Sequence, residues 1–248
     1  MRDMEYSGYI NSINTANSAE EIQEMCTQFF LELGFDKFIY GSRMPTSFLH
    51  PDVHIVNGYP AEWRERYDQL NYISIDPTVN YCSKNILPLD WADLHCVENV
   101  NPAIGEFMNE ARDFGLQEGV SFSLHSAQGE FAMLSLASSD QRHVFRKKIQ
   151  KILPYGQMFF AHLHEAIRRT IDDNEVMKEE QTLTKREKEC LLWAADGKTS
   201  WEIANIIMVS ESTVVHYLQS AMKKMHADNR QHAIARAVAR GLIVPHLG

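Results

Sequence analysis

The residues of this sequence best suited to contacting a partner lie along one face of a predicted helix near the C-terminus. Residues 210–225 have helical periodicity, and one stripe of that helix carries Ser212, Val215, His216, Gln219 and Lys223. The opposite stripe carries only apolar side chains, at Val214, Leu218, Ala221, Met222 and Met225. The hydroxyl, imidazole, amide and ammonium groups of the first stripe can donate hydrogen bonds, and the ammonium adds positive charge. The helix therefore has one face to pack and one face to bind.

The helices around it are marked by their ends. Thr184–Glu187 and Thr199–Glu202 each have the spacing of a capping box, so each starts a helix. Met208-Val209 then turn the chain into Ser210, a good N-cap, and Asn229 caps a fourth helix. A short helix, a tight turn and a longer helix form a helix-turn-helix outline, although pairs of helices of this kind are also common in purely structural packing.

The distribution of charge favours a binding role for this segment. From residue 182 onward nine Lys and Arg stand against six Asp and Glu, which gives a net charge of +3. The whole chain carries −9, so residues 1–181 carry −12. A small positive module on an acidic body suits contact with nucleic-acid phosphates at one end of the protein, because each neutralised phosphate releases condensed counterions. The excess is modest, so one copy should bind DNA weakly.

A second group of chemically active side chains lies between residues 59 and 91. Pro60 opens a predicted helix that sets Trp63 and Tyr67 one turn apart on one face. Asp76 precedes Pro77 and starts another helix. Two ordinary interpretations stand beside a binding site: an Asp before Pro is a common helix N-cap, and clustered aromatic side chains usually form a core.

The elements that position these groups predict two domains. Residues 1–172 have the length of one ordinary domain, 173–181 form an acidic and polar linker, and 182–248 form the helical module. In the first domain we expect an α/β/α sandwich with an antiparallel sheet. Its helices are predicted at 19–33, 102–114 and 142–171, and its strands at 38–40, 53–56, 120–124 and 131–137. Pro154 and Gly156 should kink or interrupt the last helix, whose apolar side chains face either a partner or the domain's own core.

Composition excludes several classes of protein. No segment approaches the roughly 20 apolar residues of a membrane span, and residues 1–5 do not resemble a signal peptide. Cys26, Cys82, Cys96 and Cys190 have no paired spacing, which is typical of free thiols in a reducing cytoplasm. We therefore expect a cytoplasmic protein without membrane contact and without a metal or other cofactor.

The C-terminal module resembles the DNA-binding domain of LuxR-type transcription regulators. The resemblance runs over residues 183–225 and 229–243, and its most characteristic matches are Glu187, Leu191, Gly197, Lys198-Thr199, Glu202-Ile203-Ala204 and Thr213-Val214. It implies that DNA is contacted by Lys198, Thr199, Ser212, Thr213, Val215, His216, Gln219 and Lys223. Positions 215 and 219 match those that reach base edges in the family. Many members carry Lys, Arg or Asn where this chain has Val215, so the DNA site read here can differ from the usual one.

The first domain resembles the acyl-homoserine-lactone-binding domain of quorum-sensing receptors of the same family. Trp63, Tyr67, Asp76, Pro77, Trp91 and Gly119 all stand at matching positions. Such a ligand has a lactone carbonyl, an amide and a fatty tail. The resemblance implies a site formed by Tyr59, Trp63, Tyr67, Asp76, Thr78, Val79, Trp91, Phe107, Met133 and Ser135.

The residue types in this set agree with such a ligand. The Trp63 indole N–H suits the lactone carbonyl, and the ionised Asp76 carboxylate suits the amide N–H. Tyr59 and Ser135 can donate to the amide carbonyl. The resemblance further implies that Trp91 packs on the lactone ring and that Tyr67, Phe107 and Met133 border the tail, and we expect Thr78 and Val79 to flank the head group.

The sequence therefore predicts a ligand-dependent transcription regulator that senses an N-acyl-homoserine lactone and binds promoter DNA as a homodimer, with RNA polymerase as a further partner. One alternative is a LuxR-type regulator that responds to another small molecule or to none. An enzyme acting on lactones or amides is a third possibility. The sequence opposes it, because there is no G-x-S-x-G motif and His162 and His164 should point about 200° apart on a helix. A phosphate-receiver domain is opposed by the absence of its acidic cluster.

Overall fold

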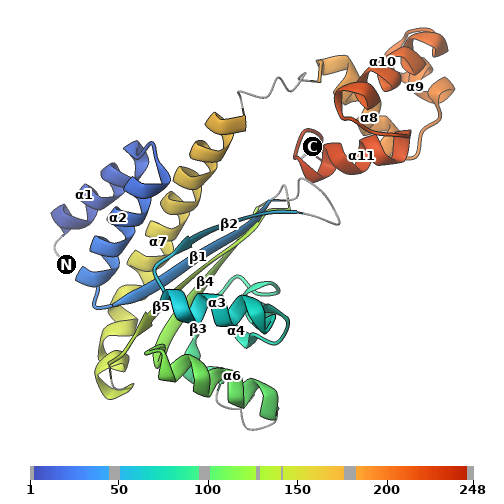
Figure 1. The fold of residues 1–248 in the computed structure, drawn as a ribbon. Coiled ribbons are helices and arrows are strands. Elements are labelled where there is room, and N and C mark those ends of the chain that lie inside the picture. The colour runs from blue at the N-terminus through green and yellow to red at the C-terminus, as the bar shows by residue number, and fades with distance from the viewer. Residues whose placement is uncertain are drawn as a thin grey trace. The chain divides into compact units, whose positions relative to one another are not determined.

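A computed structural model describes residues 3–44, 51–94, 101–126, 129–140, 142–175 and 183–244. The chain divides into an N-terminal unit that contains a sheet with its helices and a C-terminal unit of four helices, shown in Figure 1. Among the described residues no helix is long and apolar enough to cross a membrane. Cys26, Cys82 and Cys190 are buried free thiols, and Cys96 lies outside the described residues.

The N-terminal unit is built on a five-stranded sheet with the order β2-β1-β5-β4-β3. The strands are β1 (Lys37–Met44), β2 (Asp52–Asn57), β3 (Leu89–Asp90), β4 (Glu118–His125) and β5 (Phe131–Ser138). β4 pairs antiparallel with β3 and with β5, and Ser121 stands directly opposite Ser135. This sheet confirms the predicted architecture, while the two-residue strand β3 was not predicted.

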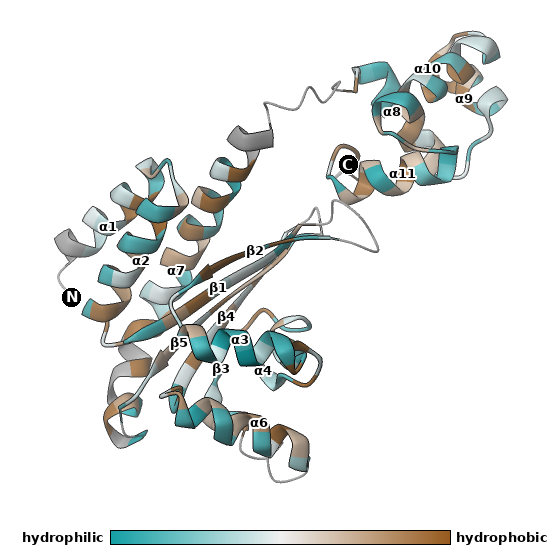
Figure 2. Cartoon of the chain, in the orientation of Figure 1, coloured by the Kyte–Doolittle hydropathy of each residue, from teal (hydrophilic) through white to brown (hydrophobic). Residues whose placement is uncertain are grey.

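The two faces of the sheet differ because side chains alternate along each strand. On β4, Val120 and Phe122 face one side and belong to the largest hydrophobic core. Ser121 and Ser123 face the other side and are nonetheless almost fully buried. Figure 2 shows the hydrophobic colouring along the strands and on the helices packed against them. One face of the sheet is therefore an ordinary core and the other contains buried hydroxyl groups.

Three helices cover the apolar face: α1 (Asp3–Thr15), α2 (Ala19–Glu32) and α7 (Arg142–Glu175). Of the predicted kink or interruption of the last helix, the interruption is wrong, because α7 runs without a break through Pro154. A Cβ added at Gly156 would lie 2.7 Å from Phe122 Cζ, so the glycine lets α7 approach the sheet closely. The apolar side chains of this helix that could face either a partner or the core are Val144, Ile149, Ile152, Phe159, Phe160 and Leu163. All but Val144, which is half-buried, are buried in the core and therefore pack within the domain.

Shorter helices cover the opposite face of the sheet (Figure 1). They are α3 (Ala61–Gln69), the 3-10 turn η1 (Tyr72–Ser74), α4 (Pro77–Cys82), the 3-10 turn η2 (Trp91–Leu94) and α6 (Pro102–Asp113). Together with β3 and β5 they enclose a second, smaller hydrophobic cluster that includes Trp63, Tyr67, Trp91 and Phe107. The residues predicted for a ligand site therefore come from the elements on this side.

The C-terminal unit contains α8 (Lys185–Ala195), α9 (Ser200–Ile207), α10 (Glu211–Lys224) and α11 (Arg230–Ala239). Both predicted capping boxes are present, at Thr184–Glu187 and Thr199–Glu202. Met208 ends α9 in the left-handed region at φ 57°, which makes the sharp turn into α10. Residues 173–175 of the expected linker lie in α7, and residues 176–181 lie outside the described residues.

Candidate functional site

Five aromatic side chains form a continuous wall between α3, η1 and α6. We call Trp63, Tyr67, Tyr72, Phe107 and Phe114 the aromatic wall. The ring centroids of Trp63 and Phe107 are 5.8 Å apart, and those of Tyr72 and Phe107 are 5.0 Å apart. Such edge-to-face and tilted contacts stabilise the wall beyond the area that it buries. The helical spacing predicted the Trp63–Tyr67 pair, whereas Tyr72 and Phe114 were not predicted.

Asp76 is both a helix cap and a buried acceptor beside this wall. Its Oδ1 accepts from the Thr78 backbone N–H at 2.7 Å, the Thr78 hydroxyl at 2.6 Å and the Val79 N–H at 3.4 Å. Its Oδ2 accepts from the Tyr67 hydroxyl at 2.9 Å. Burial raises the pKa of Asp76, and the hydrogen bonds from Thr78 and Tyr67 oppose that rise. The N-cap interpretation is therefore correct, and among the described residues Oδ2 has one partner, Tyr67.

A line of hydrogen bonds connects η2 to strands β4 and β5 of the sheet. The Trp91 indole Nε1 donates to Ser121 Oγ at 2.8 Å, and Ser121 Oγ lies 2.7 Å from Ser135 Oγ. A Cβ at Gly119 would lie 2.6 Å from the Trp91 ring, so only glycine lets the indole lie against β4. The sequence predicted Trp91 and Ser135 but not Ser121. The alternation of side chains along β4, which puts Ser121 on the face opposite Val120 and Phe122, was the available signal.

Two donors of the predicted set have no hydrogen bond within the described part of the chain. The Tyr59 hydroxyl is buried without a hydrogen-bond partner. Burial and the nearby Asp76 charge raise the pKa of Tyr59, and Ser135 lowers it. The indole N–H of Trp63, which is 2% exposed, also makes no hydrogen bond to any described residue. A buried donor without a hydrogen bond is costly, so the Tyr59 hydroxyl marks a position where a ligand acceptor is favoured, and the Trp63 N–H is available to a second acceptor.

The remaining predicted residues lie in the same region with less direct contacts. Val79 contributes its backbone N–H to Asp76. Met133 is half-buried on the face of β5 that carries Ser135, opposite Ser123 of β4. The structure thus brings nine residues together around Asp76 and the aromatic wall, and it places Met133 further along the sheet.

A charged clamp that the sequence did not predict holds the wall from outside. Arg66 on α3 donates from Nε and from its terminal nitrogen to the two Glu110 oxygens of α6, at 2.6 and 2.8 Å. The Tyr72 hydroxyl donates to Glu110 Oε2 at 2.8 Å. Hydrogen bonds from Arg66, and then from Tyr72, hold the pKa of Glu110 at about 2 despite some burial. This clamp ties α3, η1 and α6 together.

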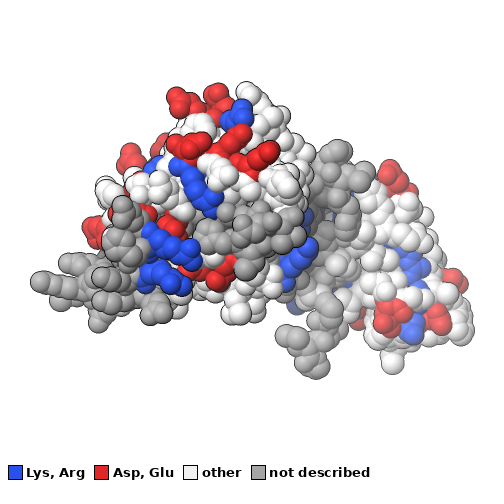
Figure 3. Space-filling model, turned by 90° about the horizontal axis from the view of Figure 1, so that it is seen from below, with Lys and Arg blue, Asp and Glu red and all other residues white. Residues whose placement is uncertain are grey.

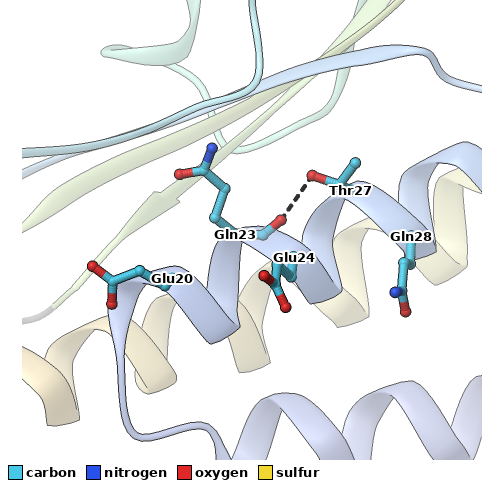
Figure 4. Close-up of a pocket in the computed structure, with 5 residues that line it drawn as sticks. All are labelled: Glu20, Gln23, Glu24, Thr27 and Gln28. Carbon is cyan, nitrogen blue, oxygen red and sulfur yellow. Dashed lines mark hydrogen bonds between the residues drawn. The ribbon is translucent and has the colours of Figure 1, made fainter.

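A separate pocket lies on α2, lined by Glu20, Gln23, Glu24, Thr27 and Gln28 (Figure 4). Its lining side chains come from one helix and are polar, and the only hydrogen bond drawn among them joins the Thr27 hydroxyl to the Gln23 carbonyl within that helix. None of the predicted site residues contributes to it. We assign it no function.

The predicted DNA-contacting face of α10 is exposed. Ser212, His216, Gln219 and Lys223 are exposed, Val215 is 38% exposed, and Val214, Leu218 and Ala221 are buried. Ser210 caps the helix by accepting from the Thr213 N–H at 3.2 Å. Thr199 caps α9 from an exposed position, and Lys198 is half-buried beside it. The two-faced helix predicted from the sequence is therefore confirmed.

Glu187 fixes this helix to its neighbour. The carboxylate, which is 3% exposed, accepts from Lys224 at 2.8 Å and from the Ser220 hydroxyl at 2.6 Å. Burial alone would raise the pKa of Glu187, but the bonds from Lys224 and Ser220 outweigh it and lower the pKa to about 2. On the face seen in Figure 3, acidic and basic side chains are interspersed on the C-terminal unit, in keeping with its small net charge.

Comparison with known proteins identifies the class. The profile of the autoinducer binding domain matches residues 18–167, and that of the LuxR family of bacterial regulatory proteins matches residues 181–237. A regulator that couples a small-molecule-binding domain to a helix-turn-helix domain is the class that the fold and these matches define. The chain belongs to the LuxR family of transcription regulators.

Several relatives align along nearly the whole chain. The transcriptional activator VanR of Vibrio anguillarum is 36% identical over 87% of this chain and 88% of its own. The activator LuxR of Aliivibrio fischeri is 33% identical over 94% and 92%. The crystal structure of Escherichia coli SdiA superimposes with a TM-score of 0.74 at 27% identity, covering 98% of this chain and 99% of SdiA. SdiA in complex with octanoyl-rac-glycerol superimposes with a TM-score of 0.75 at 26% identity, covering 99% and 100%.

VanR and LuxR are transcriptional activators, which together with the autoinducer binding domain confirms a ligand-responsive transcription regulator and opposes the enzyme alternative. The two histidines of α7 agree with that conclusion. His162 Nδ1 pairs with Asn14 Oδ1 at 2.9 Å, and His164 Nδ1 pairs with the Tyr40 hydroxyl at 2.8 Å. They therefore serve different contacts between elements of the fold.

Proposed function

We propose that this regulator binds an N-acyl-homoserine lactone in the cytoplasm, against the aromatic wall, and that the bound form dimerises on promoter DNA. The observation that carries the proposal is the Tyr59 hydroxyl, which is buried without a hydrogen-bond partner among the described residues and lies close enough to the Asp76 carboxylate for its charge to raise the Tyr59 pKa. Trp63 Nε1, in the same aromatic cluster, is a second donor without a hydrogen bond to a described residue. The lactone carbonyl, the amide carbonyl and the amide N–H of such a ligand supply the complementary groups. The aromatic surroundings suit its apolar remainder.

Asp76 has room for the ligand amide. An ionised carboxylate offers about four acceptor positions over its two oxygens. Oδ1 already accepts from Thr78 and Val79, while Tyr67 is the only described residue that donates to Oδ2. A ligand N–H on Oδ2 would complete the coordination without displacing the helix cap.

A second ligand class deserves the same test because a structural relative, SdiA, has been solved with octanoyl-rac-glycerol. An acylglycerol shares the acyl tail and a carbonyl with the lactone, and it carries hydroxyls in place of the amide N–H. Both ligands can satisfy Tyr59 and Ser135. They differ in the group presented to Asp76.

The experiment is a binding panel of lactones with different tails plus octanoyl glycerol, measured on wild type, Asp76→Asn and Trp63→Phe. Asn is also a good N-cap, so Asp76→Asn should keep α4 while presenting an amide that cannot reproduce the carboxylate. Asp68→Asn is the matched control, because Asp68 is exposed on α3 and pairs only with Arg64 among described residues. We expect one lactone to bind, with at least about a tenfold loss in Asp76→Asn, as for a hydrogen bond to a charged group. If only octanoyl glycerol binds, the ligand of this regulator is an acylglycerol and not a lactone.

We further propose that DNA is read by Ser212, Thr213, Val215, His216, Gln219 and Lys223 of α10, supported by Lys198 and Thr199, and that RNA polymerase is a partner of the bound dimer. Residues 1–172 would hold the ligand and residues 182–248 the DNA. Two modules of net charge +3 that read half-sites about one helical turn apart multiply their affinities. Binding to a two-half-site DNA should therefore be strongly tighter than to a single half-site. Equal affinities for the two DNAs would exclude the dimer.

A further inference from the structure

The line of hydrogen bonds from Trp91 to Ser135 has a defined direction. The indole N–H of Trp91 can only donate, so Ser121 Oγ is its acceptor. Ser121 is fully buried and has one proton of its own to place. The only other hydrogen-bond partner that the described residues give this hydroxyl is Ser135 Oγ, at 2.7 Å. Because a buried hydroxyl proton without a partner is costly, Ser121 donates to Ser135.

That direction determines what Ser135 can do. Its oxygen is occupied as an acceptor from Ser121, so its own proton turns away from β4. Ser135 is 2% exposed, and its hydroxyl lies close enough to that of Tyr59 to lower the Tyr59 pKa. The Tyr59 hydroxyl is buried and forms no hydrogen bond of normal geometry with a described residue. The line therefore ends in two hydroxyl donors, from β5 and from the segment before α3, at one side of the candidate pocket.

We propose that Trp91 and Ser121 are positioning residues that turn the Ser135 hydroxyl proton toward a carbonyl oxygen of the bound ligand. This inference rests on the proposed ligand site and adds a cause for its selectivity. A fixed pair of donors favours a ligand that presents an acceptor there and disfavours one that presents a donor. Trp91 thus acts through its N–H, in addition to the packing of its ring against Gly119.

The test compares N-octanoyl-homoserine lactone with its thioamide, in which sulfur replaces the amide oxygen and accepts hydrogen bonds more weakly. Both are measured in competition on full-length protein, and the ratio of their dissociation constants is the thioamide penalty. In Trp91→Phe the N–H is absent, so Ser121 is free to accept from Ser135 and competes with the ligand for that proton. We expect the penalty to fall by about two- to tenfold, the range for one neutral hydrogen bond.

The double variant Trp91→Phe/Ser121→Ala distinguishes positioning from packing. The double variant removes Ser121 Oγ, the acceptor that competes for the Ser135 proton. That proton then returns to the ligand, and the thioamide penalty rises again although the site has lost more contacts. If the smaller ring prevents folding, benzothienylalanine at position 91 replaces the indole N–H with sulfur at nearly the same ring size. Ser123→Ala is the matched control, because Ser123 lies on the same face of β4 but donates to the Asn85 carbonyl.

The outcomes separate this inference from the proposed function. A penalty that falls in Trp91→Phe, recovers in the double variant and stays unchanged in Ser123→Ala supports the positioning role. If the wild type binds the lactone and the thioamide penalty is the same in the wild type and in every variant, the inference is overturned and the proposed ligand stays in place. Wild-type protein that binds no lactone overturns the proposed ligand and the inference together.

Discussion

Replacing Tyr67 with Phe isolates one hydrogen bond of the candidate site. The change removes the hydroxyl that donates to Asp76 Oδ2 at 2.9 Å and leaves the ring in the aromatic wall. Asp76 is 8% exposed, so water does not replace the lost donor fully. A hydrogen bond to a charged group contributes about 1.5–3 kcal/mol, and we expect Tyr67→Phe to lower the free energy of unfolding by that amount at neutral pH.

The pH dependence follows from the raised pKa of Asp76. Burial raises the native-state pKa above its unfolded value, so the contribution of this group to stability is greatest at low pH and is lost as the pH rises through the native pKa. Removing the Tyr67 donor raises that pKa further. The difference in stability between wild type and variant should therefore be largest at neutral pH and should shrink as Asp76 becomes protonated in both proteins.

The assay is denaturant unfolding across pH, with Tyr72→Phe as the control. Tyr72 belongs to the same wall, but its hydroxyl meets Glu110, which Arg66 already holds at both oxygens. Because this network is largely exposed, Tyr72→Phe should cost under about 1 kcal/mol. A loss in Tyr67→Phe that is equally small, or one that persists unchanged when Asp76 is protonated, would refute the reasoning.

Three further predictions concern packing, an ion pair and DNA. Gly119→Ala should abolish soluble, ligand-binding protein because its Cβ would lie 2.6 Å from an indole ring, whereas Gly41→Ala, with nothing within 4 Å, should be tolerated; equal yields would contradict this. Glu187→Gln should lower the free energy of unfolding by about 2 kcal/mol at neutral pH. Because the native pKa of Glu187 is lowered to about 2, its ionised carboxylate stabilises the fold above that pH, and the difference should vanish as the pH falls toward it. A loss that does not depend on pH would argue for packing instead. Gln219→Ala should relax the base preference at one position of the DNA site. Lys223→Ala should weaken binding to all DNA sequences alike and reduce the slope of log affinity against log salt concentration by about one. The opposite pattern would exclude the proposed roles.

The sequence predicted those parts of the fold that local patterns control. Capping boxes marked α8 and α9, and the stripe of apolar residues on α10 correctly identified its buried face. Pro154 was misleading because tertiary packing, including the close approach of Gly156 to Phe122, overrides the local preference for a break. The apolar face of α7 had two interpretations, and burial in the core decided between them.

The sequence predicted residues that the structure brings together, but it did not predict the hydrogen bonds and the ion pair that connect them. Asp76 was recognised both as a cap and as an acceptor, and the structure shows the cap bonds together with the bond from Tyr67. Ser121 and the Arg66–Glu110 pair were missed because they depend on contacts 30 and 44 residues apart in the chain. Strand register and helix placement create such contacts, and periodicity in one segment does not report them.

We propose that an acyl-homoserine lactone, held through Asp76, turns this chain into a DNA-binding regulator. The most direct test is soluble yield and DNA binding of the full-length protein expressed with and without a lactone panel, for wild type and Asp76→Asn. Ligand at about 100 times its Kd should add roughly 2.7 kcal/mol of stability. We predict that one lactone raises the yield, the unfolding temperature and the DNA binding of wild type, and that Asp76→Asn loses all three responses. Soluble protein that binds DNA equally well with every lactone and with none would contradict the account.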